Sequence, residues 1–169
     1  MAVQTEMEQG NKPGILVAEL YFRPAELDIS ALTRADLVFD GVDHSGMSYE
    51  VRTFLNNPEA DETTPRALEQ GYGGRFVVFG HGGCYGDLGH CDVPTERRAP
   101  HDLRLEHQLM PETKIVTVTE ALEYVLQEGS GELTNVTLVP ISKDPLIENQ
   151  GLTEDLFKFD SVELRTYYT

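Results

Sequence analysis

The chain has 169 residues, of which 40% are hydrophobic, which is enough for one ordinary domain with a single sizeable core. Its formal net charge of −16 at pH 7 repels nucleic acid and anionic membrane surfaces, and it favours partners that are basic or carry a metal. No stretch has the length and apolarity of a transmembrane span, and the polar, acidic N-terminus lacks the features of a signal peptide. We therefore expect a cytoplasmic protein with reduced cysteines, with export alongside a partner as the alternative.

Short runs of strand-forming residues, separated by turn-rich joints, follow one another along the chain. Residues 1–14 are polar and are expected to be a flexible arm, and one domain is expected to fill residues 15–169. Residues 56–74, rich in Asn, Pro, Gly and acidic residues, are predicted to be a loop, and the apolar run 75–80 is predicted to be a buried strand. Strands are predicted at residues 15–22, 35–42, 48–55, 75–80, 102–110, 114–119, 135–140 and 157–168.

A single helix is predicted at residues 119–129, with Thr119 as its N-cap. Its apolar stripe consists of Ala121, Leu122, Val125 and Leu126. In the last predicted strand the apolar phase shifts between Phe159 and Val162, which predicts a bulge or a bend. Because helices do not alternate with strands, the sequence predicts a mainly β protein. The expected architecture is an antiparallel β-sandwich or a partly closed barrel of seven to eight strands with one short helix.

The most distinctive segment is GHGGCYGDLGHC, residues 80–91, which holds both cysteines and two of the five histidines. Thiolate and imidazole together suit Zn(II) or Cu(I). The candidate metal ligands are His81, Cys84, His90 and Cys91.

This segment admits three other interpretations. A disulfide between Cys84 and Cys91 would close a short loop, and its formation depends on the compartment. An ordered loop with packed thiols and imidazoles needs neither a metal nor a disulfide. A phosphate loop is disfavoured, because no Lys and Ser/Thr follow the glycines and Asp87 would repel the anion.

Five pieces of the chain, taken in order, carry a resemblance to a known family. They are SYEVRTFLNNP, GYGGRFVVFGHGGCYGDLGHCDVP, VTEALEYV, NVTLVP and FKFDSVEL, within residues 35–169. Together they resemble the β-rich C-terminal domain of tyrosinase-like type 3 copper proteins. The same architecture recurs at the end of plant polyphenol oxidases and of mollusc haemocyanin units.

The resemblance implies an accessory β-sandwich that packs against a four-helix copper domain and covers the mouth of its active site. It makes Tyr85 a candidate placeholder for substrate, and Cys84 and Cys91 candidate transient Cu(I) ligands. A type 3 dicopper site takes six histidines from a helical bundle, whereas this chain has five, none of them paired on a helix. The resemblance therefore implies that the chain cannot build that site alone.

Three functional hypotheses follow. The first is a non-catalytic accessory module that covers a tyrosinase-like catalytic domain or assists its copper loading, or that associates with itself. The second is a stand-alone metal-binding protein or metalloenzyme that holds copper or zinc in the 80–91 loop, with His101 completing the ligand shell. The third is a plain interaction β-sandwich. None of the three involves nucleic acid or a membrane.

Overall fold

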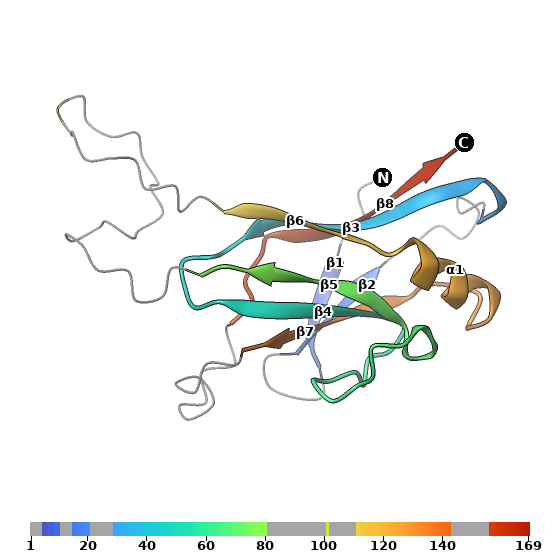
Figure 1. Ribbon diagram of the computed structural model, residues 1–169, viewed down its shortest axis with the longest axis horizontal. Helices are drawn as coiled ribbons and strands as arrows, with labels where there is room; N and C mark the ends of the chain where they lie inside the picture. Colours follow the sequence, from blue (N-terminus) through green and yellow to red (C-terminus); the bar gives the residue numbers. More distant parts are fainter. Residues whose placement is uncertain (1–4, 11–14, 21–28, 81–100, 102–110, 143–155) are drawn as a thin grey trace.

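The computed structural model describes residues 5–10, 15–20, 29–80, 101, 111–142 and 156–169. The described residues form two antiparallel sheets that pack face to face, with one helix at one end (Figure 1). The first sheet has five strands in the order β1 (Thr5–Gln9), β2 (Leu16–Leu20), β7 (Asn135–Ile141), β4 (Tyr49–Leu55) and β5 (Tyr72–Val78). The second has three strands in the order β6 (Glu112–Thr117), β3 (Leu32–Val42) and β8 (Ser161–Tyr168). The predicted mainly β class is confirmed, and over these residues it takes the form of a sandwich.

The core lies between the inner faces of the two sheets. Alternate residues of each strand point inward, because successive side chains of a strand lie on opposite faces. Fully buried side chains from both sheets meet there, among them Leu37, Phe39, Val51, Leu55, Val78, Leu138 and Val162. A second, smaller cluster of Ile15, Phe54, Ala60 and Val139 covers part of the outer face of the five-stranded sheet.

Helix α1 (Thr119–Gln127) closes one end of the sandwich, and its buried face is the predicted one. Ala121, Leu122 and Val125 are buried, as amphipathic spacing requires. The predicted N-cap is wrong, because the N-cap residue is Val118 and makes no side-chain capping bond. The Thr119 hydroxyl instead accepts a hydrogen bond of 3.0 Å from the backbone N–H of Ala35, which ties the start of the helix to β3.

One strand lies where none was expected, and another begins earlier than predicted. Strand β1 falls inside residues 1–14 and pairs with β2, with Thr5 opposite Leu20 at one end. Strand β5 begins at Tyr72, inside the predicted 56–74 loop. The first residues of β5 were not predicted as strand because they include Gly73 and Gly74, and glycine has a low strand propensity. Here Gly74 has φ 132° and runs so close to β6 that a Cβ on it would lie 2.8 Å from Val116 Cγ1.

The predicted bend between Phe159 and Val162 is confirmed. Phe157 and Phe159 precede the last strand, the chain bends at Asp160, and β8 begins at Ser161. The predicted strand at 102–110 lies outside the described residues. The helix of the described part is too short and too polar to cross a membrane.

Candidate functional site

The residues singled out by the sequence, His81, Cys84, Tyr85, His90 and Cys91, lie outside the described residues. The structure does describe the base of their segment. The backbone N–H of Gly80 donates a hydrogen bond of 3.0 Å to Ser48 Oγ. A Cβ on Gly80 would lie 2.3 Å from backbone atoms of Gly46 and Met47, so only glycine fits there without a shift. Gly80, the first residue of the 80–91 segment, therefore lies beside the turn between β3 and β4.

The other histidines do not complete a metal site in the described part of the chain. His44 lies in the turn between β3 and β4 and is 5% exposed, with Nδ1 3.9 Å from Glu112 Oε1. His101 is exposed, and His107 falls outside the described ranges. Among the described residues, no three His, Cys, Asp or Glu side chains gather closely enough to hold a metal ion.

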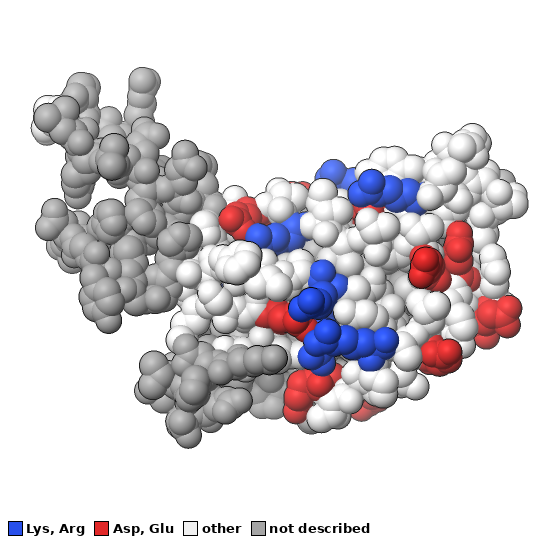
Figure 2. Space-filling view, viewed as in Figure 1, with Lys and Arg blue, Asp and Glu red and all other residues white. Residues whose placement is uncertain are grey.

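A charged cluster lies on the outer face of β4 and β5, and we call it the Glu50 cluster. It consists of Glu50, Arg52, Arg66 and Arg75. Glu50 Oε1 accepts hydrogen bonds from Arg52 Nε at 2.8 Å and from Arg66 Nη2 at 3.0 Å, and Arg75 Nη1 donates to Glu50 Oε2. Figure 2 shows basic side chains gathered over these strands. With three guanidinium groups on one carboxylate, the cluster has a formal charge of +2 within a chain of −16.

The environment of Glu50 shifts the titration of its carboxyl group. Partial burial raises the pKa of Glu50, but the hydrogen bonds from Arg52 and Arg75 and the charges of Arg66 and Arg75 outweigh burial. The pKa of Glu50 therefore lies below its ordinary value of 4.5. A carboxyl group with a lowered pKa stabilises the fold above its unfolded pKa, and this stabilisation is lost as the pH falls through the folded pKa.

Replacing Glu50 with glutamine is expected to lower the free energy of unfolding at pH 7 by about 1–3 kcal/mol, because three guanidinium groups lose their shared anion. The difference between wild type and variant should shrink as the pH falls below 4.5, where the wild-type carboxyl group takes up its proton. Urea unfolding of both proteins from pH 7 to pH 3 measures this difference.

The matched control is Glu163→Gln, which removes a carboxylate paired with Arg165 on the other sheet. That surface pair is expected to contribute about 1 kcal/mol or less. An equal loss in the two variants, or a Glu50→Gln loss that does not depend on pH, would contradict the role given to Glu50.

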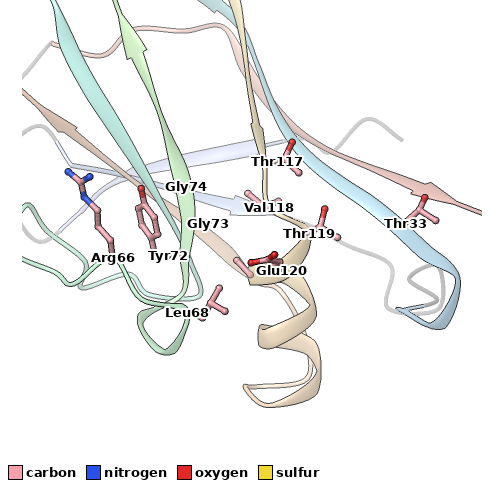
Figure 3. A pocket seen from close by; sticks show the side chains of 11 residues that line it. Thr33, Arg66, Leu68, Tyr72, Gly73, Gly74, Thr117, Val118, Thr119 and Glu120 are labelled. Carbon is pink, nitrogen blue, oxygen red and sulfur yellow. The ribbon is translucent and has the colours of Figure 1, made fainter.

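A hollow of about 590 Å³ opens next to the cluster, between β5 and the start of α1 (Figure 3). Arg66, Leu68 and Tyr72 line one side, and Thr117 and Glu120 line another. Thr117 is already engaged, because its hydroxyl donates a hydrogen bond of 2.8 Å to Asp36 Oδ1. This lining contains no histidine, cysteine or lysine among its described residues, so it offers neither a soft metal ligand nor a nitrogen base for a nucleophile.

The sequence alone did not point to the Glu50 cluster. It placed Glu50 and Arg52 in the predicted strand at residues 48–55, but it assigned Arg66 to the predicted loop at residues 56–74. It also predicted a buried strand at residues 75–80; a strand is present there and ends at Val78, but only one of its faces is buried. Phe76 and Val78 are buried, but Arg75, Val77 and, just beyond the strand, Phe79 face outward, because only the inner face of β5 packs against the core between the sheets. Val77, Val78 and Phe79 are apolar on both faces, so the sequence shows no alternation of polar and apolar residues here.

Comparison with solved structures finds this fold within larger oxidases. The structure of a latent aurone synthase (polyphenol oxidase) from natural source matches 95% of this chain at 20% sequence identity, with a TM-score of 0.52, and the match covers 26% of that chain. A recombinantly expressed latent aurone synthase (polyphenol oxidase) matches 98% of this chain at 17% identity, with a TM-score of 0.47, over 24% of its own length. This chain thus spans about a quarter of either oxidase. No family model matched the sequence, and a search of curated proteins found no match.

Proposed function

We propose that this chain is an accessory β-sandwich module of the tyrosinase-like kind, which docks on a copper-bearing catalytic domain, covers its mouth and assists its copper loading. One observation carries the proposal. The fold of nearly the whole chain, 95% of it, is shared with 26% of a latent polyphenol oxidase. A module that corresponds to one part of an oxidase is best explained as a partner of the remainder.

The number of histidines supports a function in which a partner domain supplies the copper site. A type 3 dicopper site, as the resemblance implies it, takes six histidines from a helical bundle, and this chain has five. His44 is buried in the sandwich, in the turn between two strands, and not on a helix. In this proposal the catalytic copper belongs to the partner domain.

The 80–91 segment is the part that we propose acts on the partner. Its two thiols and two imidazoles are a donor set that suits Cu(I), which favours soft ligands, and also Zn(II). In this proposal Cys84 and Cys91 hold Cu(I) transiently, with His81 and His90 close by in the sequence. Tyr85 occupies the substrate position of the partner while the module is bound.

The test mixes the full chain with a tyrosinase-like copper enzyme that lacks a β-rich domain of its own, prepared with and without copper. Size-exclusion chromatography with light scattering should show a complex, and oxidation of a diphenol by the copper-loaded enzyme should fall about tenfold or more when the chain is bound. Tyr85→Ala should bind equally well and restore most of the activity. Cys84→Ser/Cys91→Ser should also bind, but it should fail to transfer Cu(I) to the copper-free enzyme, as measured by elemental analysis.

Two results would decide against this function. If the chain stays monomeric beside every tyrosinase-like enzyme tested, docking is wrong. If it never docks but retains close to one equivalent of copper or zinc that the cysteine variant lacks, the stand-alone metal-binding hypothesis replaces it.

A further inference from the structure

The outward residues of β5 and Phe79, which directly follows the strand, form a line that changes from charged to apolar. Arg75, Val77 and Phe79 alternate with buried residues, so all three lie on the outer face. Alternate side chains of a strand are about 7 Å apart. Phe79 is 75% exposed, which is unusual for a phenylalanine. We call this line together with the Glu50 cluster the β5 surface.

The charged end of the β5 surface is organised before any ligand arrives. Arg52 is largely buried and also donates to the backbone carbonyl of Glu62 at 2.9 Å, whereas Arg66 and Arg75 are about half exposed. Glu50 holds all three guanidinium groups close together through one hydrogen bond from each. A guanidinium group has five N–H donors, so Glu50 leaves donors of Arg66 and Arg75 for a further anion.

The rest of the surface limits which anion can bind. The chain as a whole is −16, so a long polyanion such as nucleic acid would be repelled beyond the cluster. A short carboxylate-bearing segment is repelled less, because it can lie on the positive cluster without extending along the rest of the acidic chain. The combination of arginine with an exposed aromatic residue is typical of the energetically important part of protein interfaces.

We infer that the β5 surface binds an extended acidic segment of another protein. Carboxylate side chains of the segment lie on Arg66 and Arg75, and apolar side chains that follow at alternate positions lie on Val77 and Phe79. An extended segment is specified because its period of two residues matches the spacing along β5. This inference goes beyond the proposed function and does not depend on it.

The experiment uses a short, dye-labelled synthetic peptide in which two glutamates precede two apolar residues at alternate positions, titrated with the full chain and followed by fluorescence anisotropy. The peptide should bind, and binding should weaken as salt is raised. Arg66→Gln/Arg75→Gln should weaken binding at least about tenfold, since two charge-assisted contacts are lost. Phe79→Ser should weaken it several-fold, and because Phe79 is exposed this substitution provides a second variant if the first does not fold.

Arg165→Gln is the matched control for Arg75→Gln. Arg165 is similarly exposed and pairs with Glu163, two residues before it, but it lies in the other sheet, so its replacement should leave binding unchanged. A glutamine version of the peptide should not bind. Equal affinities of the β5-surface variants and the control, or an absence of binding, would overturn the inference.

Two further outcomes would overturn the identity of the occupant. Inorganic phosphate that displaces the peptide at equimolar concentration would indicate a simple anion site. A reversible dimer of the chain alone in sedimentation equilibrium, lost in Arg66→Gln/Arg75→Gln, would indicate that a second copy occupies the surface.

Discussion

Replacing Phe39 with alanine is expected to lower the free energy of unfolding by about 3–5 kcal/mol, the range for truncating a fully buried phenylalanine. Phe39 lies on β3 with no exposed surface. Its ring centroid is 5.0 Å from that of Phe76 on β5, 6.0 Å from that of Phe157 and 5.8 Å from that of Phe159. One side chain therefore joins the two sheets and the segment that leads into β8, and each aromatic pair adds to the loss.

Urea unfolding followed by far-ultraviolet circular dichroism measures this loss, and Phe79→Ala is its control. Phe79 is an exposed phenylalanine just beyond the end of β5, the strand of Phe76, so its truncation should change the free energy of unfolding by about 0.5 kcal/mol or less. A loss at Phe39 below about 1 kcal/mol would mean that the two sheets do not pack through this residue.

Replacing Gly71 with alanine is expected to cost about 3 kcal/mol, through both backbone strain and collision. Gly71 ends a 3₁₀ turn (Leu68–Gln70) with φ 75°, in the left-handed region that side chains rarely adopt. A Cβ would lie 2.1 Å from the carbonyl oxygen of Leu55. That oxygen belongs to the backbone and cannot swing away, and the N–H of Leu55 already donates to the Gly71 carbonyl at 2.7 Å.

Gly131→Ala separates the two causes. Gly131 has φ 81° but no heavy atom within 4 Å of the position of a Cβ, so alanine there should cost only the strain of the left-handed conformation, about 1 kcal/mol. Thermal and urea unfolding of both variants provide the comparison. Equal costs at the two positions would contradict the close approach of Gly71 to Leu55.

The local pattern of the sequence was sufficient for the fold class and for most of the strands. Alternation along residues 48–55 and the spacing of Ala121, Leu122 and Val125 report which face of each element is buried, and burial follows directly from hydrophobicity. The same reasoning was wrong at Thr119 and at the start of β5. At both positions a partner distant in the sequence is involved: the Thr119 hydroxyl accepts a hydrogen bond from Ala35, and the start of β5 pairs with β4, with Gly74 opposite Thr53.

The candidate functional residues also fall into those that the sequence predicted and those that only the structure revealed. The sequence by itself determined that two thiols and two imidazoles lie within residues 80–91, because ligand chemistry is carried by residue type and spacing. Only the tertiary structure brought Arg66 and Arg75 onto Glu50, from 16 and 25 residues away. Local periodicity contains no information about such pairings, since strand register and the path of the connection between β4 and β5 decide which distant side chains meet.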